Sequence, residues 1–456
     1  MLLSSRTVRA GLPAALTLLL ASTAGAQTPT AAPLKIDSGD NAWMLASSAL
    51  VLMMTAPGLM LFYGGLVRRK NVLATMMQSI FLISVVSLLW FAYGYSMAFG
   101  EGGAFFGNPL QYLFLRDVGS APHADYAATI PHQTFMIYQM MFAIITPGLI
   151  TGAFAERMKF SAFLAFMIGW VTLVYFPLAH MIWGKGGLFN WALGGRIPVL
   201  DFAGGTVVHI SSGAAALVCA LVLGPRRGFP REPMLPHNVV LTLIGTGLLW
   251  VGWFGFNAGS ALSSGALATS AFAATHFAGA AGGLAWAATE WLGKRKVSVL
   301  GAASGMVAGL ATITPASGFV TIPSAVLIGL SGGVACYFAV TKLKAACGYD
   351  DSLDVFGVHC VGSIVGMVLL GLLASADVNP LIASTFQKNG ATVSLVGSPG
   401  QLVNQLLGIA ATFVLSGLVT FLLLKVIGAT IGLRVDTEAE HAGLDISEHG
   451  ESAYNE

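Results

Sequence analysis

Charged side chains are scarce in this chain. Asp, Glu, Lys and Arg make up only 9% of its 456 residues, whereas hydrophobic residues make up 55%. The mean hydropathy is +0.77. So little polar surface cannot cover a water-soluble globule of this size. The composition therefore predicts a polytopic membrane protein.

Basic patches and metal-binding clusters are also missing from the sequence. The net charge is only +2, and the Lys and Arg residues are not gathered beside aromatic residues, which excludes a recognisable nucleic-acid surface. The four cysteines lie in or beside apolar segments without the spacing of a zinc site or a disulfide framework. We interpret them as small buried hydrophobic residues and expect no cofactor. No HExxH motif supports an intramembrane metalloprotease, and we do not expect an enzyme.

The N-terminus has the composition of a cleaved signal peptide. Arg6 and Arg9 precede a short apolar run, and a small-x-small sequence ends at Ala26. We therefore predict that residues 1–26 are removed and that the mature chain starts near Gln27. A retained first span is the alternative, but the apolar run is short and is interrupted by Gly and Pro.

Long apolar runs fill the rest of the chain. A helix needs about 20 residues to cross the roughly 30 Å hydrocarbon core of a bilayer. Eleven runs meet this need and predict an all-α membrane domain over residues 27–431. They lie near residues 43–65, 73–98, 133–153, 160–182, 203–224, 237–259, 268–291, 299–316, 320–342, 355–375 and 400–430. Many are rich in Gly and Ala, which lets helices approach closely in lipid.

Basic residues alternate between the two sides of this predicted bundle. Every second connection is basic, so that thirteen Lys and Arg residues lie on one side and four on the other. The positive-inside rule then places the mature N-terminus outside and the tail, residues 432–456, in the cytoplasm. We expect a multi-pass protein of the inner (cytoplasmic) membrane, surrounded by lipid.

Eleven spans divide into five, five and one. The first and sixth spans share a Gly-aromatic signature, GLMLFYGG at 58–65 and VGWFGFNAG at 251–259. The fifth and tenth spans contain DFAGGTVVH at 201–209 and DVFGVH at 354–359. These pairs predict two inverted repeats and one extra helix, with a working site near the bilayer midplane. The predicted boundaries are about 40–225, about 236–376 and about 400–431.

Each span of the second pair leads from an Asp to a lone His. Eight residues separate Asp201 from His209 and Asp351 from His359, which is about 12 Å along each helix. Two such descents from opposite faces leave about 6 Å of a roughly 30 Å core, so the two imidazoles could touch. An ionisable residue inside a membrane is costly and often marks a pathway. For each His alone, a structural hydrogen bond between helices is the alternative.

Together these segments resemble the ammonium transporter family (Amt/Mep/Rh), and in particular its bacterial Amt branch. The resemblance covers nearly the whole mature chain. It rests on DFAGGTVVHI at 201–210, GWFGFNAGSA at 252–261, DVFGVH at 354–359, GAFAERMKFSA at 152–162 and the tail at 432–456. The resemblance implies a homotrimer with one narrow hydrophobic pore through each protomer, which passes ammonium from outside to the cytoplasm.

The same resemblance implies an outer site that recruits ammonium. It falls on Trp183, Phe142 and Ser260, with Tyr138 at a position where Phe is frequent. Aromatic faces attract a small cation through their quadrupoles. Asp201 matches a buried acidic residue below this site. The sequence also permits plainer roles, because Trp183 could be an interfacial anchor and Asp201 could cap the fifth helix.

The resemblance further implies a pore in which stacked phenylalanines lie above twin histidines. The positions concerned are Phe142 and Phe256 for the rings, His209 and His359 for the histidines, and Trp253 and Tyr175 for aromatic residues near the pore mouth. Ordinary packing is the alternative for the phenylalanines. We expect ammonium to lose a proton near the two rings and ammonia to move along the histidines, because a bare cation is costly in an apolar pore.

Two other functions remain to be compared with transport. A metal transporter could use two histidines, but no carboxylate or thiolate cluster accompanies them. A non-conducting ammonium sensor is the stronger alternative, although only about 25 residues follow the last span, and sensors of this family usually append a signalling domain. The tail also resembles that of the bacterial branch, and this implies a PII-type signalling protein as a cytoplasmic partner.

Overall fold

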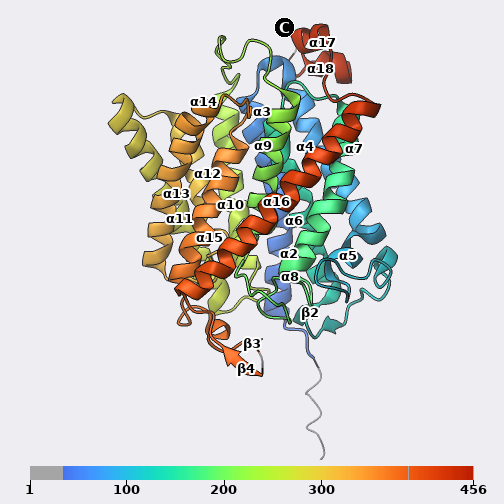
Figure 1. The fold of residues 1–456 in the computed structure, drawn as a ribbon, viewed down its shortest axis with the longest axis vertical. Coiled ribbons are helices and arrows are strands. Elements are labelled where there is room, and N and C mark those ends of the chain that lie inside the picture. Colours follow the sequence, from blue (N-terminus) through green and yellow to red (C-terminus); the bar gives the residue numbers. More distant parts are fainter. Residues whose placement is uncertain (1–33, 389, 455–456) are drawn as a thin grey trace, which may run out of the picture.

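The computed structural model describes residues 34–388 and 390–454 and forms one bundle of long helices (Figure 1). The predicted signal peptide, residues 1–26, lies outside the described residues. Most helices run along the long axis of the molecule, and α16 (Pro399–Thr430) crosses the front of the bundle diagonally.

The remaining helices of the bundle follow in chain order. They are α2 (Ser38–Met53), α3 (Met60–Leu66), α4 (Val72–Leu89), α5 (Tyr95–Phe99), α6 (His132–Phe154), α7 (Phe160–Trp170), α8 (Phe176–Trp183), α9 (Ser211–Leu223), α10 (Val239–Gly259), α11 (Ala266–Lys294), α12 (Val299–Ile313), α13 (Ile322–Phe338), α14 (Lys344–Cys347) and α15 (Val361–Leu373).

Several of these helices are joined or extended by π-helical turns, which hold one residue more per turn than an α-helix and are frequent at functional sites. The π-helical turns are η1 (Met54–Leu59), η3 (Trp90–Gly94), η5 (Val171–Tyr175), η6 (Gly205–Ile210), η7 (Ala339–Leu343) and η8 (Phe356–Cys360). Short 3-10 turns are η2 (Arg69–Asn71), η4 (Leu113–Leu115) and η9 (Pro380–Ala383). The hydrophobic periodicity of the sequence did not predict these turns.

Nine helical segments within residues 34–388 and 390–454 are long and apolar enough to cross a membrane. Helix α12, with 15 residues, is a shorter apolar helix, and the 29-residue α11 is not among the nine. These two helices correspond to the predicted runs at 268–291 and 299–316. The predicted all-helical membrane fold is therefore confirmed, while the number of eleven spans stays a prediction.

Small residues bring α11, α12 and α13 into close contact, as expected from their composition. A Cβ atom at Gly282 of α11 would lie 2.6 Å from the carbonyl oxygen of Gly305 and 2.6 Å from the Cα of Gly309, both in α12. No side chain fits at such a distance. The glycines of these helices therefore set the spacing of this side of the bundle.

The tail forms two short helices, α17 (Thr437–Ala442) and α18 (Leu444–His449), at one end of the bundle (Figure 1). Asp445 Oδ1 accepts a hydrogen bond from the backbone N–H of Ala74 at 2.8 Å, and Glu448 Oε2 accepts one from Phe160 N–H at 2.8 Å. Two tail carboxylates thus cap the first turns of α4 and α7, whose N–H groups lack partners within the helix.

Two small hairpins lie at the opposite end of the bundle. One pairs β1 (Pro122–His123) with β2 (Ala127–Pro131), and the other pairs β3 (Phe386–Lys388) with β4 (Ala391–Val393). Both pairs are antiparallel. Helix α8, which ends at Trp183, lies toward the same end (Figure 1). We call it the outer end, after the orientation predicted from the sequence.

Candidate functional site

Two buried imidazoles meet in the middle of the bundle. His209 lies in η6 and His359 in η8, and their Nδ1 atoms are 3.2 Å apart. The ring centroids are 5.2 Å apart and the planes differ by 12°. The two imidazoles are in contact, as the sequence analysis allowed, but the eight-residue helical paths assumed for this contact are wrong. Residues 201–204 and 351–354 are not helical, and η6 and η8 begin only at Gly205 and Phe356. A glycine permits it, because a Cβ atom at Gly213 of α9 would lie 2.5 Å from Cβ of Cys360.

The hydrogen bond between the two rings determines what the remaining nitrogens can do. One Nδ1 must carry a proton and the other must accept it, so one ring presents Nε2 as an acceptor and the other presents Nε2–H as a donor. Nε2 of His209 is buried and has no hydrogen-bond partner among the described residues. The neutral pair therefore offers one donor and one acceptor without carrying a charge.

Aromatic rings enclose His209 on its other sides. The Trp253 ring stacks on it with centroids 5.6 Å apart, and the Phe256 ring lies at 6.0 Å. The Trp253 indole N–H donates to Thr314 Oγ1 at 2.9 Å, which fixes the ring. Thr314 was not predicted as a site residue, and its position after α12, in a Pro- and Gly-containing break, is the only signal for it in the sequence.

A narrow cavity of about 20 Å³ lies against the histidine pair. It is too small for a hydrated ion and is almost entirely apolar apart from the two imidazoles. Its lining residues are Met54, Leu59, Phe62, Tyr63, Ile145, Leu149, Val208, His209, Leu249, Trp253, Phe256, Val307 and His359.

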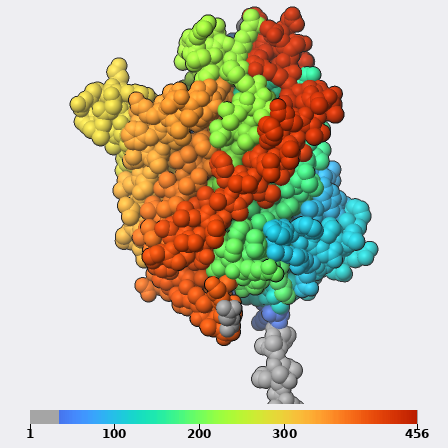
Figure 2. Space-filling model, viewed as in Figure 1, coloured from blue at the N-terminus to red at the C-terminus, as the bar shows by residue number. Residues whose placement is uncertain are grey.

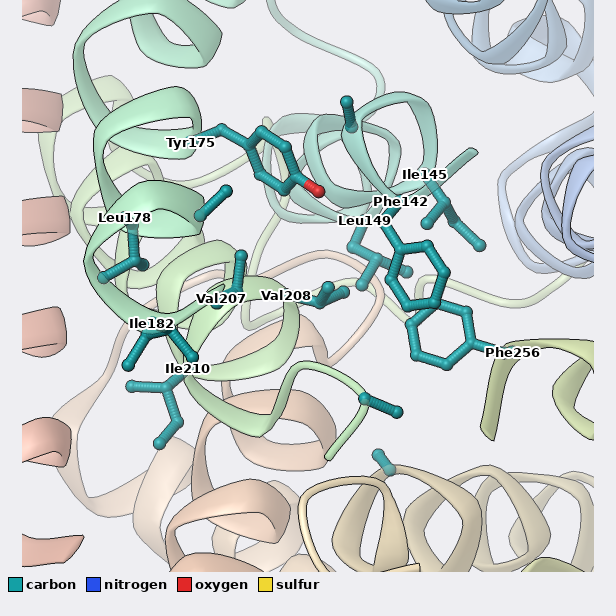
Figure 3. Close-up of a cluster of buried hydrophobic side chains, with 14 of the residues drawn as sticks. Phe142, Ile145, Leu149, Tyr175, Leu178, Ile182, Val207, Val208, Ile210 and Phe256 are labelled. Carbon is teal, nitrogen blue, oxygen red and sulfur yellow. The ribbon is translucent and has the colours of Figure 1, made fainter. Parts of the chain in front are cut away.

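Two stacked phenylalanines close the outer side of this cavity. The rings of Phe142 and Phe256 have centroids 4.2 Å apart and planes that differ by 31°. Both side chains are fully buried. Figure 3 shows the two rings face to face, with Ile145 and Leu149 of α6, the helix that carries Phe142, beside them. The pair therefore separates the narrow cavity from the space outside.

A wide cavity of about 320 Å³ opens on the outer side of the phenylalanines. Trp183, Phe142, Ser260 and Asp201 are among its lining residues, so the structure brings together four of the five residues considered for ammonium recruitment. The Trp183 ring meets Phe142 edge to face at 5.9 Å. Phe135 and Gln139 also line this cavity, although the sequence analysis did not identify them.

Tyr138 does not line the wide cavity with the other four residues. It is fully buried, and its hydroxyl donates to the backbone oxygens of Gly255 and Phe256 at 3.0 and 2.8 Å. Its oxygen is 3.2 Å from Ser260 Oγ, and its ring meets Phe142 at 5.1 Å. Tyr138 therefore supports the cavity wall from behind and presents no free ring face to the cavity.

The carboxylate of Asp201 caps the start of η6. Oδ1 accepts from the N–H groups of Gly204 and Gly205 at 2.8 and 2.7 Å, and Oδ2 accepts from Thr206 N–H at 2.7 Å and from the Thr206 hydroxyl. The Trp183 indole N–H donates to the backbone oxygen of Asp201 at 3.1 Å. Asp201 therefore has the capping role that the sequence permitted. Through its bonds it also connects Trp183 to η6, the turn that carries His209.

On the inner side, a third cavity of about 200 Å³ leads away from His359. It shares Phe62, Tyr63, Val307 and His359 with the narrow cavity and adds Ser352 and Asp354 to the wall. Tyr175, which the sequence suggested near the pore mouth, lines none of the three cavities described here; it lies on η5 with its hydroxyl turned toward α6 (Figure 3). The three cavities follow one another through the bundle.

The model of the family described as Ammonium Transporter Family matches residues 42–454 of this chain. An ammonium transporter of Bacillus subtilis is 46% identical over 418 residues, which cover 92% of this chain and 99% of the relative. A putative ammonium transporter of Methanothermobacter thermautotrophicus is 48% identical over 420 residues, which cover 92% of this chain and 99% of the relative.

Solved structures agree with the sequence relatives. The crystal structure of Saccharomyces cerevisiae Mep2 superposes with a TM-score of 0.79 at 35% identity and covers 88% of this chain and 90% of Mep2. A protein described as a sensor Amt protein superposes with a TM-score of 0.80 at 28% identity and covers 90% of this chain and 98% of its own. Matched along nearly its whole length in sequence and in fold, this chain is a multi-pass membrane protein that belongs to the ammonium transporter family.

Proposed function

We propose that this chain carries ammonium across the membrane by passing it as ammonia along His209 and His359. One observation carries the proposal. A wide cavity, a pair of stacked rings and a narrow cavity with two hydrogen-bonded imidazoles follow one another through the bundle. Family membership agrees with a transporter rather than an enzyme.

Recruitment takes place in the wide cavity. Ammonium lies against the faces of Trp183 and Phe142, which attract a small cation. Ser260 Oγ donates its proton to Phe256 O at 2.9 Å, so its lone pairs are available to accept a hydrogen bond from ammonium. Asp201 acts through position, because its four hydrogen bonds to residues 204–206 hold the start of η6 beside this cavity.

Deprotonation occurs as ammonium leaves the wide cavity at the Phe142 and Phe256 rings, and water in that cavity takes the proton. A bare cation in the narrow apolar cavity would lose its hydration without receiving new ligands, whereas neutral ammonia needs only a few hydrogen-bond partners. Potassium has a similar size but has no proton to lose, so it cannot become neutral and does not permeate. Beyond the rings, one Nε2 acceptor and one Nε2–H donor of the histidine pair receive the ammonia molecule.

Uptake of ammonium into proteoliposomes, together with current recording on the reconstituted protein, tests this proposal. Ammonium should pass and potassium should not. His209→Ala and His359→Ala should each lose ammonium-selective transport, and the double variant should be little worse than either single variant, because each ring orients the other. Additive losses, or a His209→Ala variant that still transports and still excludes potassium, would contradict the proposal. The same recordings decide between electrogenic transport and neutral gas conduction.

The finer topology is part of the proposal. Eleven spans, arranged as two inverted five-helix repeats and a last helix, would place the start of the mature chain outside and the tail inside. The histidine contact supports this arrangement, since η6 and η8 approach each other from different ends of the bundle. Labelling of single cysteines introduced at Ala391 and at Ser447, with a reagent that does not cross the membrane, tests it: only position 391 should react in intact cells.

The N-terminal processing and the location are proposed on sequence grounds alone. Cleavage after residue 26 and residence in the inner membrane follow from the signal-like composition and from the charge alternation. N-terminal sequencing of protein purified from the membrane should return a start near Gln27. An intact Met1 would contradict the cleavage.

The proposed partners are two further copies of this chain and a PII-type signalling protein. Cross-linking in the membrane should give a trimer and no larger ladder. Binding of a PII-type protein should depend on residues 432–456, so binding that is the same with and without the tail would contradict that part of the proposal.

A non-conducting ammonium sensor is the second candidate function. It is favoured by one observation, the close superposition with the protein described as a sensor Amt protein. A sensor would bind ammonium in the wide cavity but would show no current and no uptake. The transport measurement above therefore separates the two candidates.

A further inference from the structure

The chain between α5 and β1 contains a long uncharged stretch at the outer end of the bundle. Residues 102–115 read GGAFFGNPLQYLFL and include no Asp, Glu, Lys or Arg. Glu101 and Arg116 flank the stretch. We call residues 102–115 the phenylalanine lobe. It follows α5 on the right flank of the molecule, beside the lower ends of the helices (Figure 1).

Four large apolar side chains of the lobe point away from the protein. Phe105 is 59% exposed, Phe106 54%, Leu110 68% and Phe114 61%. Figure 2 shows this part of the chain, in blue to light blue, bulging from the right flank of the surface. Exposed apolar patches of this kind mark a surface that is covered by a partner or by lipid.

The lobe is continuous with an exposed apolar wall of the bundle. The Phe114 ring meets the Phe91 ring with centroids 5.6 Å apart. Phe91 lies in η3, is itself exposed, and belongs to the segment Arg69–Phe99, which is apolar enough to cross a membrane. The exposed phenylalanine of the lobe thus extends the apolar surface of a segment that can cross a membrane.

The backbone of the lobe is held in an uncommon conformation that turns Phe114 outward. Phe114 and Leu115 have φ values of 54° and 56°, and Asp117 follows with 63°. Bulky residues rarely adopt positive φ, and such a conformation persists only where the surroundings determine it. In water, the chain would gain by relaxing and burying these side chains, so an apolar environment outside the lobe explains the conformation better.

We propose that the phenylalanine lobe is inserted into the boundary between headgroups and acyl chains of the outer leaflet, where lipid covers Phe105, Phe106, Leu110 and Phe114. Aromatic and aliphatic side chains at this depth bind the boundary through buried apolar area. The charged residues on either side of the lobe, Glu101 and Arg116, limit the inserted stretch.

The inserted lobe also holds one wall of the wide cavity. Gly103 O lies 2.8 Å from His180 Nε2, and Ala104 O accepts a hydrogen bond from Leu188 N–H at 2.7 Å. His180 belongs to α8, whose last residue is Trp183. The lobe therefore joins the lipid boundary to the helix that carries a recruitment side chain, and it anchors that wall at a fixed depth.

Depth-dependent quenching tests the insertion in the full-length protein. In a Cys347→Ser background, which removes the exposed cysteine, single cysteines at Phe114→Cys and Leu110→Cys are labelled with an NBD fluorophore. The protein is reconstituted in phosphatidylcholine vesicles with or without a doxyl group near the headgroup. Both labels should show blue-shifted emission and strong quenching by the doxyl lipid, with little quenching by aqueous iodide.

Two control positions give the quenching expected for a label in water and for a label deep in the bilayer. Ala391→Cys in the exposed β4 strand lies at the same end of the bundle and should be quenched by iodide only. Leu418→Cys on the exposed face of α16 should be quenched by a doxyl group deep in the acyl chain. Iodide quenching at 110 and 114 would overturn the proposal, because the lobe would then face water. Labels protected from both quenchers would also overturn it, because a second protein chain would then cover the lobe.

Discussion

Two chain segments lead to the histidines, and an aspartate side chain caps the helical turn in each of them. We call residues 201–209 the outer arm and residues 351–359 the inner arm. The two caps differ in how many hydrogen bonds they form. In the outer arm, Asp201 caps η6 and both of its oxygens are occupied by donors from residues 204–206. In the inner arm, Asp351 caps η8 through a single bond, from Phe356 N–H to Oδ2 at 2.7 Å, and its buried Oδ1 has no partner among the described residues. The outer arm is therefore fixed by its own backbone, while the inner arm is only partly satisfied.

The rings at the ends of the arms differ in the same way. His209 is enclosed by Trp253 and Phe256, whereas His359 lines both the narrow cavity and the larger inner cavity. Charged groups surround the inner arm, where Lys344 Nζ donates to Asp351 O and Asp354 Oδ1 at 2.6 Å each. The comparison shows that His209 is held rigidly by its neighbours, whereas His359 lies beside a larger cavity with charged groups nearby.

The largest difference should appear when each capping carboxylate is removed. Asp201→Ala leaves three backbone donors and one hydroxyl without a partner, so it should lower the free energy of unfolding by about 2 to 4 kcal/mol and abolish ammonium uptake. Asp351→Ala loses one bond and should cost only about 1 kcal/mol. Thermal unfolding of the purified proteins measures the difference, and Asp201→Glu should keep part of the uptake. Equal losses in the two Ala variants, or full uptake in Asp201→Ala, would contradict the comparison.

We expect the free energy of unfolding to depend on pH through Asp351 of the inner arm. Burial raises the pKa of Asp351 to about 6, partly offset by Lys344, so the folded protein holds a proton there that the unfolded chain releases at lower pH. Stability should therefore fall as the pH rises from about 4 to about 6, by an amount on the order of 1 to 3 kcal/mol.

The matched variant is Asp351→Asn, which cannot ionise. The difference in unfolding free energy between it and the unmodified protein should change across this pH interval and become constant above it. A difference that is independent of pH would mean that Asp351 is ionised in the fold throughout.

The support of His209 should be sensitive to Thr314. Thr314→Val keeps the shape but removes the acceptor of the Trp253 indole N–H, which costs about 1 to 2 kcal/mol for a buried donor. We expect ammonium uptake to fall by about tenfold, which corresponds to 1.4 kcal/mol, with a rise in potassium permeation. Thr314→Ser keeps the hydroxyl and should restore both properties. If Val and Ser variants behave alike, the bond to Thr314 does not position Trp253.

The smallest effect should come from the tail. Glu448→Gln weakens the cap on α7, because a neutral oxygen replaces the carboxylate that accepts from Phe160 N–H. A cap contributes about 0.5 to 2 kcal/mol, and the amide keeps part of it. The melting temperature should fall slightly, with ammonium uptake by the purified protein unchanged. Glu451→Gln changes a tail carboxylate that makes no hydrogen bond to the bundle within the described residues, so it is the matched control and should not shift the melting temperature.

Features with a strong local signal could be predicted from the sequence. The apolar runs place the helices within a few residues of their observed ends, as at 133–153 for α6 (His132–Phe154). The reason is that a helix in a bilayer needs an unbroken run of apolar residues. The sequence also indicated that His209 and His359 could touch, and they do. The helical paths assumed for this contact are absent, because residues 201–204 and 351–354 are not helical. The positions of the helices depend on one chain segment at a time.

Features that depend on several segments could not be predicted in this way. Tyr138 has a ring suited to cation binding, yet its hydroxyl is bound to backbone oxygens of α10, and no local pattern reveals that orientation. Gln139 and Phe135 line the wide cavity because of the rotation of α6 within the bundle. Thr314 serves as an acceptor only through the tertiary approach of α10 to the end of α12.

The π-helical turns have a consequence for insertions and deletions. Each residue of a helix turns the following ones by about 100°. His359 lies in η8 just before Cys360, so the deletion of Cys360 would rotate the ring by about that angle relative to α15 and away from His209. A change of one residue in length at this place would thus separate the rings without altering either histidine.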